Sequence, residues 1–109
     1  MTTFLVANPT GQGALWGTET EDLNATVVSW PEGTGVAAHT NDLVDVVMIV
    51  LAGQGTVRVG DGTEALAPGT VVSIPKRFER EIWATAGTLT YVNVHKRKPK
   101  MQPNMVRPR

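Results

Sequence analysis

Four side chains of this sequence could meet in one binding site, and their types decide its chemistry. His39 and Asn41 stand two residues apart after the glycine turn GTG at 33–35, and Asp45 precedes a run of apolar residues. Arg80 follows much later in the chain. Imidazole and carboxylate groups bind divalent metal ions, whereas a guanidinium binds carboxylates and phosphates through parallel hydrogen bonds. These residues could therefore hold either a metal ion or an anion.

Length and composition indicate a single domain. The 109 residues are 41% apolar and 18% charged, with 11 glycines and 7 prolines, which is typical of a compact, turn-rich domain. There is no cysteine, so disulfides, thiolate metal ligands and cysteine nucleophiles are excluded. No stretch has the pattern of a signal peptide or the roughly 20 apolar residues of a membrane helix. We expect a cytoplasmic protein without a membrane partner.

The basic residues are concentrated at the C-terminal end. Residues 96–109 contain six of the ten Lys and Arg residues, whereas all ten acidic residues lie at or before Glu81. A basic tail can bind nucleic acid, but this one is short, contains prolines and lacks an aromatic residue for stacking on bases. We therefore predict no nucleic-acid partner. The tail is expected to lie along the acidic domain, residues 1–95, or along a partner subunit.

The spacing of apolar runs predicts an all-β fold. β-Branched runs bounded by Gly, Pro, Asn or Asp recur about every eight to twelve residues, as in sandwiches and barrels, and helical periodicity is lacking. The ten expected strands are 4–6, 14–16, 25–30, 36–39, 46–51, 56–59, 63–66, 71–74, 80–84 and 89–94. Ten short strands in one domain require a closed barrel or two packed sheets.

The run VVMIVLA at 46–52 predicts a homodimer. It has no polar alternation, so both of its faces should be covered. A barrel of this size covers only the inner face of a strand. A second subunit is therefore expected on the outer face.

Two stretches within residues 25–95 resemble the two motifs of the small single-domain cupins. The residues that carry the resemblance are Gly35, His39, Asn41 and Gly53 in the first motif, and Pro68, Gly69, Pro75 and Arg80 in the second. The intervening LAGQGTVRVGDG also matches the family pattern. The resemblance implies the cupin double-stranded β-helix, which is a jelly-roll barrel.

Cupins commonly hold a divalent metal ion with three histidines and a glutamate, and this chain departs from that pattern. By resemblance, the four ligand positions fall on His39, Asn41, Val46 and Arg80. Arginine is permanently protonated and has no lone pair, so it repels a cation. Asp45 precedes the third position by one residue and would need a β-bulge to face His39. We expect no metal cofactor; the alternative is a divalent transition metal bound by His39 and Asp45.

The inner side of a cupin barrel would combine apolar walls with a few polar groups, as small-molecule sites do. The predicted ligand-binding residues are His39, Asn41, Met48, Arg80, Ile82 and Asn93. Arg80 would suit a carboxylate or phosphate. His39 could act as a catalytic proton donor or acceptor near neutral pH, and Tyr91 as a neutral acid.

Several of these residues also have purely structural interpretations. Arg80 could pair with a neighbouring glutamate, and Asn41 is a natural turn residue that can cap backbone amides. The face of strand 89–94 that carries Tyr91 and Asn93 could point outward, with the valines in the core. Parity alone does not decide between these two orientations.

Three kinds of function fit the sequence. The first, which we predict, is a cupin that binds a small organic molecule, an anion if Arg80 faces it, without a metal. It would be a binding or accessory protein, or a proton-transfer enzyme of the isomerase, cyclase or dehydratase type. The second is a metal-dependent enzyme of the dioxygenase type that uses His39 and Asp45. The third is a non-catalytic interaction module with a basic tail. Fold alone does not choose among them or decide whether the protein is an enzyme.

Overall fold

The structure is a computed structural model that describes residues 1, 3, 5–6 and 9–97, and β-strands are the only regular elements among them. The strands are β1 (Gly13–Glu19), β2 (Leu23–Trp30), β3 (Gly35–His39), β4 (Val46–Val59), β5 (Gly62–Leu66), β6 (Val71–Ile74) and β7 (Arg80–Lys96). The predicted all-β class is confirmed. Within the described part of the chain, no helix could span a membrane.

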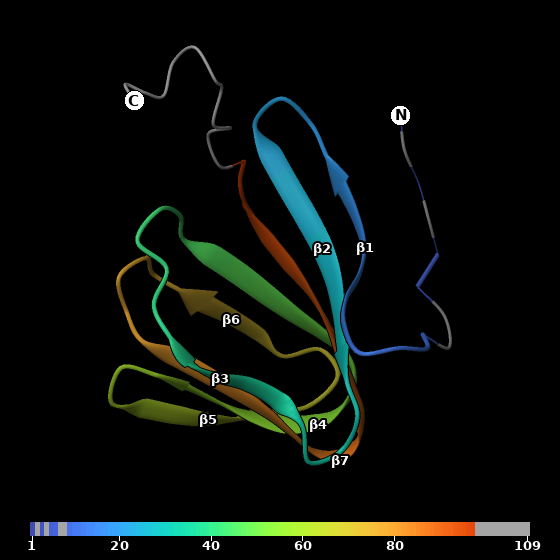
Figure 1. Ribbon diagram of the computed structural model, residues 1–109, viewed down its shortest axis with the longest axis vertical. Coiled ribbons are helices and arrows are strands. Elements are labelled where there is room, and N and C mark those ends of the chain that lie inside the picture. Colours follow the sequence, from blue (N-terminus) through green and yellow to red (C-terminus); the bar gives the residue numbers. More distant parts are fainter. Residues whose placement is uncertain (2, 4, 7–8, 98–109) are drawn as a thin grey trace, which may run out of the picture.

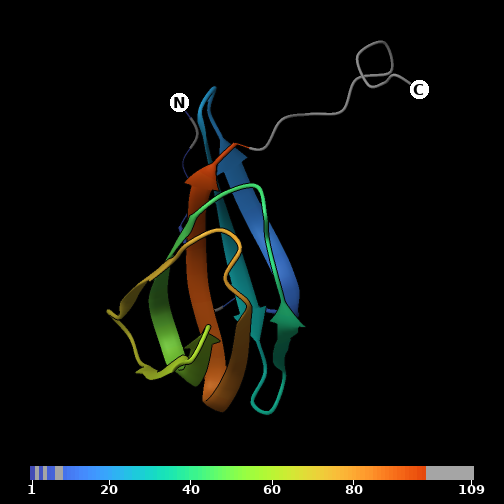
Figure 2. The ribbon, with the colours of Figure 1, turned by 90° about the vertical axis from the view of Figure 1, so that its left-hand side faces the viewer.

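The strands form two facing walls that share β4 and β7 (Figure 1). The first wall contains β1, β2, the second half of β7, the first half of β4, and β6. The second wall contains β3, the first half of β7, the second half of β4, and β5. All of these pairs are antiparallel. Figure 2 shows β7 curving along the length of the molecule from one wall into the other.

The sequence predicts ten short strands and the structure has seven, chiefly because two expected pairs are continuous. Segments 46–51 and 56–59 join in β4, and segments 80–84 and 89–94 join in β7. The register between these strands shifts repeatedly from Val50 to Gly55. Such bulges bend a strand without ending it. Glycines that look like strand breaks in the sequence therefore mark a bend.

The expected strand 4–6 is wrong where the structure describes it. Leu5 and Val6 belong to no strand, and Phe4 lies outside the described residues. With this strand absent and two pairs merged, the ten expected strands become seven.

The basic segment expected as a tail begins within the sheet. Lys96 is the last residue of β7, and the backbone N–H of Arg97 donates a 2.7 Å hydrogen bond to the carbonyl oxygen of Asp22. The Arg97 guanidinium also lies 3.5 Å from the Glu19 carboxylate. The start of this segment thus contacts the acidic β1–β2 turn, and residues 98–109 lie outside the described residues.

The hydrophobic core lies between the two walls. Its buried members are Val28, Met48, Val50, Val57, Leu66, Ile82, Ala84, Leu89 and Tyr91. Side chains alternate between the two faces of a strand, so Met48 and Val50 of β4 point inward while Val47 and Leu51 remain on the outside. The same alternation decides which polar side chains enter the space between the walls.

Gly53 permits the bend of β4. Its φ of 77° lies in the left-handed region, which costs other residues about 1–2 kcal/mol. A Cβ at this position would also collide with the backbone carbonyl of Thr88 on β7. Only glycine therefore lets the two long strands approach each other at this point.

We predict that Gly53→Ala destabilises the fold by more than about 2 kcal/mol, because backbone strain and a backbone collision add together. Gly69→Ala is the matched control, since Gly69 also has a positive φ, 93°, but no atom lies within 4 Å of a Cβ built there. The control should lose only about 1 kcal/mol. Urea denaturation measures both, and equal losses would show that the close approach at Gly53 is unimportant.

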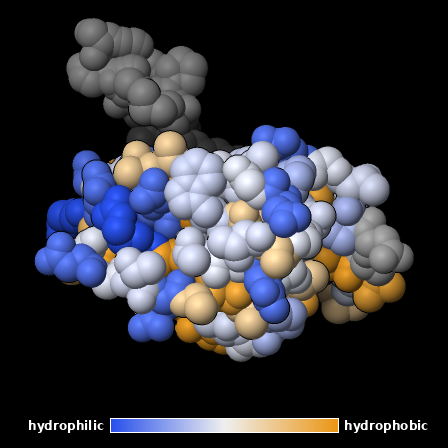
Figure 3. Space-filling view, turned by 90° about the horizontal axis from the view of Figure 1, so that it is seen from below, coloured by the Kyte–Doolittle hydropathy of each residue, from blue (hydrophilic) through white to orange (hydrophobic). Residues whose placement is uncertain are grey.

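The outer face of the first wall is largely apolar. Val92, Ile49 and Val71 lie in register across β7, β4 and β6, next to the pair Val94 and Val47. Val71 is 61% exposed and Val47 is 39% exposed. Hydrophobic residues also reach the surface at the end of the molecule shown in Figure 3, in groups at the lower and right-hand margins of that view. Contiguous exposed apolar surface is typical of interaction sites.

We predict that this outer face forms a homodimer and that Val47→Lys dissociates it, because a lysine in the centre of an apolar interface must be desolvated. Light scattering after gel filtration should give twice the 11.7 kDa chain mass for the wild type and the chain mass for the variant. Thr63→Lys on β5 is the control and should remain dimeric. A wild type that is monomeric at micromolar concentration would contradict the prediction.

Candidate ligand-binding cavity

A cavity of about 250 Å³ lies between the two walls. Its apolar lining includes Val28, Trp30, Val36, Val46, Ile74 and Ile82. Its polar lining consists of His39 from β3 and of Arg80, Tyr91 and Asn93 from β7. The lining contains no carboxylate among the described residues. Apolar walls with a few polar groups describe a typical site for a small molecule.

Arg80 places a buried positive charge at this cavity. The residue is only 4% exposed, and its burial lowers the pKa of the guanidinium from the usual value. Nε donates to the carbonyl oxygen of Phe78 at 2.9 Å, and one Nη donates to that of Pro75 at 3.1 Å. No carboxylate within the described residues pairs with it. An arginine remains protonated even when its pKa is lowered, so the cavity carries an uncompensated cation.

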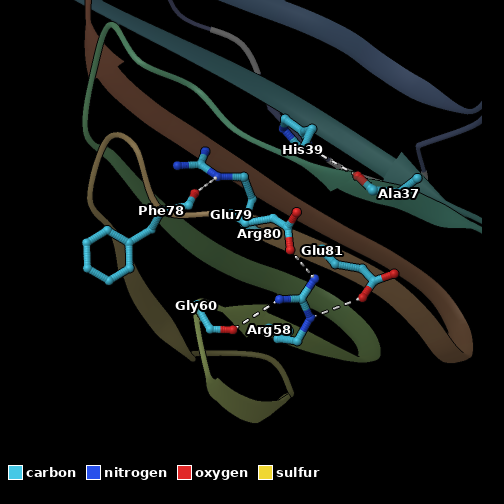
Figure 4. A network of polar contacts seen from close by, with 8 residues as sticks. All are labelled: Ala37, His39, Arg58, Gly60, Phe78, Glu79, Arg80 and Glu81. Carbon is cyan, nitrogen blue, oxygen red and sulfur yellow. Dashed lines mark hydrogen bonds and ion pairs between the residues drawn. The ribbon is translucent and has the colours of Figure 1, made fainter.

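The glutamates on either side of Arg80 are not its partners. Both form ion pairs with Arg58 on β4, whose Nη2 lies 3.0 Å from Glu79 and whose Nε lies 3.3 Å from Glu81. In Figure 4 the Arg80 side chain turns away from this group. Hydrogen bonds to Glu79 and Glu81 raise the pKa of Arg58, in contrast to the effect of burial on Arg80. Strand alternation thus separates a neutralised outer cluster from a single inner cation.

His39 lies opposite Arg80 at the edge of β3. The two residues are paired in the β3–β7 register, and both line the cavity. Nδ1 of His39 lies 3.0 Å from the carbonyl oxygen of Ala37 (Figure 4). A carbonyl can only accept, so Nδ1 carries the proton and donates it. In the neutral ring, Nε2 is then the unprotonated nitrogen, which can accept a proton or a hydrogen bond.

Tyr91 and Asn93 face the cavity from the second half of β7, and the valines beside them face the other way. The Trp30 indole N–H donates a 2.9 Å hydrogen bond to the Tyr91 hydroxyl oxygen. Burial raises the pKa of Tyr91, and the bond from Trp30 partly opposes this effect. Oδ1 of Asn93 is buried without a hydrogen-bond partner among the described residues. Of the two orientations left open by the sequence, the structure has these side chains pointing inward.

Two residues expected in the site lie elsewhere. Met48 is fully buried in the core and is not among the residues that line the cavity, although its register partner Asn93 is. The Asn41 side chain accepts hydrogen bonds from the backbone N–H groups of Leu43 and Val44, at 2.8 and 3.3 Å. Asn41 therefore caps a turn next to the site, and the expectation that these two residues line the cavity is wrong.

Comparison with known proteins identifies the architecture through structure rather than sequence. No family profile and no curated protein matches the sequence. The structure of TT1209 from Thermus thermophilus matches with a TM-score of 0.73 at 22% identity, over 84% of this chain and 89% of that one. KdgF from Halomonas sp. matches with 0.70 at 20% identity, over 75% and 76%. A cupin protein from Bacteroides fragilis matches with 0.70 at 14% identity, over 94% and 91%.

The chain has the cupin fold. A further match, from Klebsiella pneumoniae, is described as a protein with a double-stranded β-helix domain, at a TM-score of 0.69 and 17% identity over 82% of this chain and 81% of that one. The fold class expected from the sequence is therefore confirmed. Identities this low establish the fold and leave the function to be argued from the site.

The cavity of this cupin fold does not fit a divalent metal ion. His39 offers one imidazole, Val46 lines the wall where the third ligand is expected, and the guanidinium of Arg80 repels cations. Asp45 lies outside the cavity, where its Oδ1 accepts a 2.9 Å hydrogen bond from the backbone N–H of Lys76. Within residues 9–97 and the few described before them, no three His, Cys, Asp or Glu side chains are grouped to hold a metal.

Sequence reasoning missed part of this cupin cavity. Trp30 is not among the predicted site residues, yet it lines the cavity and donates a hydrogen bond to the Tyr91 hydroxyl. Val28 and Val36 line it from β2 and β3. Their inward orientation follows from strand alternation once the register is known. Gly13 and Ala14 at the start of β1 also line the cavity. No sequence pattern indicates this, because their position at the cavity depends on the path of the chain.

We predict that the single tyrosine of the chain ionises above the usual value of about 10, because Tyr91 is buried. A tyrosinate absorbance titration in the ultraviolet reports on this residue alone. The contribution of Tyr91 to the free energy of unfolding should be constant below about pH 10. It should fall as the pH rises above about 10, since Tyr91 ionises first in the unfolded chain. Trp30→Phe removes a bond that favours the phenolate and should shift the midpoint higher. A native midpoint at or below that in urea would contradict the assignment.

Proposed function

We propose that the cavity binds a small organic anion, in the first instance a carboxylate, without a metal ion. The observation that carries the proposal is the buried guanidinium of Arg80, which lines the cavity and whose partners among the described residues are backbone carbonyls. A desolvated charge without a counterion is costly in a folded protein. An anion at this position would offset that cost and gain charge-assisted hydrogen bonds.

The remaining lining supports an organic ligand over a bare inorganic ion. Val46, Ile74 and Ile82 give the cavity apolar walls that suit a carbon skeleton. Its volume of about 250 Å³ is slightly below that of sites for drug-sized molecules, which start near 300 Å³. A carboxylate that carries a short carbon chain matches both features.

Three other functions have less support. A metal-dependent enzyme lacks ligands in the cavity, since Asp45 and His39 do not share it. A proton-transfer enzyme would have His39 as its base, through the lone pair of Nε2, but the described residues offer no comparable proton donor beyond Tyr91. An interaction module would depend on the basic segment, most of which lies outside the described residues. Anion binding, in contrast, gives a role to the buried guanidinium of Arg80, which the other functions leave unexplained.

We predict that Arg80→Met weakens the binding of a carboxylate probe such as butyrate by at least about tenfold, because a hydrogen bond to a charged group contributes about 1.5–3 kcal/mol. Isothermal titration calorimetry measures the affinity directly. Arg58→Met is the matched control, since Arg58 is an arginine of the same sheet whose partners lie on the outer face. The control should bind butyrate as the wild type does.

Two results would contradict this proposal. The first is equal binding by the wild type and the Arg80 variant. The second is elemental analysis that finds close to one transition metal per chain in protein purified without a metal-affinity tag. If Arg80→Met does not fold, Arg80→Lys keeps the charge with different hydrogen-bonding geometry and should bind the probe more weakly than the wild type.

A further inference from the structure

Asn93 has an amide oxygen that no part of the described chain satisfies. Its Oδ1 is buried without a hydrogen-bond partner among the described residues. The residue is half-buried in the first wall, paired with Thr26 on one side and with Met48 on the other, and its Oδ1 is the buried atom. Buried polar groups in native proteins are nearly always paired, and an unpaired one destabilises the fold. An apolar residue at this position would be less costly for folding.

The Tyr91 hydroxyl is the second polar group on this side of the cavity. It accepts the hydrogen bond from Trp30, and its own proton has no acceptor among the described residues. Tyr91 and Asn93 are two positions apart on β7 and therefore face the same side of the strand. The cavity thus presents one phenolic donor and one amide, which can accept or donate, beside apolar walls.

We infer that the preferred ligand is a hydroxy acid, whose carboxylate binds Arg80 and whose hydroxyl group binds Asn93 and Tyr91. This inference rests on the proposed function and specifies the ligand further. A hydroxyl can accept from the Tyr91 phenol and donate to the Asn93 amide oxygen at the same time. The χ2 angle of asparagine is broad and roughly two-fold, so either end of the amide can turn toward the ligand.

An amino acid would complement this side of the cavity less well. Its ammonium group could donate to Asn93 but could not accept from Tyr91. It would also bring a second positive charge into a cavity that already contains Arg80 and, among the described residues, no carboxylate. The charge balance therefore favours a neutral hydroxyl beside the anionic group.

The test compares butyrate with 2-, 3- and 4-hydroxybutyrate, which share a four-carbon skeleton and differ in the place of one hydroxyl. The wild type should bind at least one hydroxybutyrate about three- to tenfold more tightly than butyrate, which is the effect of one net hydrogen bond. In Asn93→Val this preference should disappear, so that the ratio of the hydroxybutyrate affinity to the butyrate affinity falls to about one. Calorimetry on the full chain measures all of these affinities.

Asn24→Val on the paired strand β2 is the matched control, because it removes an asparagine outside the cavity and should keep the preference for the hydroxy acid. A second readout uses the protein without ligand. Asn93→Val should not lower its melting temperature, since it removes an unpaired polar group; a clear drop would mean that the amide is satisfied within the fold, and would overturn the inference.

The outcomes separate this inference from the proposed function. If butyrate and all hydroxybutyrates bind equally, and Arg80→Met weakens all of them, the hydroxyl preference is wrong and anion binding stands. If the preference exists but survives in Asn93→Val, the role of Asn93 is wrong. If none of the four acids binds, or binding does not depend on Arg80, both the inference and the proposed function are overturned.

Discussion

The architecture depends on the pairing of β4 with β7 along almost their whole length. These strands remain hydrogen-bonded from Val46 with His95 to Val59 with Arg80, although both bend sharply between the two walls. The bend is possible because Gly53 has a positive φ and no Cβ to meet the backbone at Thr88. β2 and β3 pair with β7, β5 and β6 pair with β4, and β1 extends the sheet beyond β2. Of the two long strands, β7 lines the cavity from both walls, through Arg80 and Ile82 in one and through Tyr91 and Asn93 in the other, and β4 adds Val46.

The chemistry of the cavity follows from side-chain alternation on β7. The first half of the strand sends Arg80 and Ile82 inward, and the second half sends Tyr91 and Asn93 inward. Glu81 lies on the outer face, where Arg58 neutralises it. A shift of one residue would place carboxylates inside and the cation outside. The electropositive character of the cavity thus depends on register as much as on composition.

The sequence was sufficient to predict those features that follow from local periodicity. Strand spacing predicts the all-β class, and parity correctly indicates that Asp45, unlike Val46, points away from the cavity. The positions of Asn41 and Met48, which were wrongly expected in the site, depend on the three-dimensional path of the chain. Whether Asn41 lines the cavity or caps a turn depends on the path of the β3–β4 loop. The Met48 side chain points inward, as strand alternation predicts. It belongs to the core because the two walls pack against each other at its position.

On the proposed function, Arg80 takes over the role of the metal ion that the motif positions suggest. The last ligand position of the cupin pattern carries a fixed cation here, so a positive charge is retained where the family pattern places a cation. A guanidinium orients a carboxylate through directional hydrogen bonds, but it has no empty coordination position and does not act as a Lewis acid. On the proposed function, Asn41 and Val46 at the other ligand positions are consistent with Arg80, because none of the three side chains favours a metal ion. The unpaired amide oxygen of Asn93 fits the same proposal, since a ligand hydroxyl in the cavity would offset the cost of its burial.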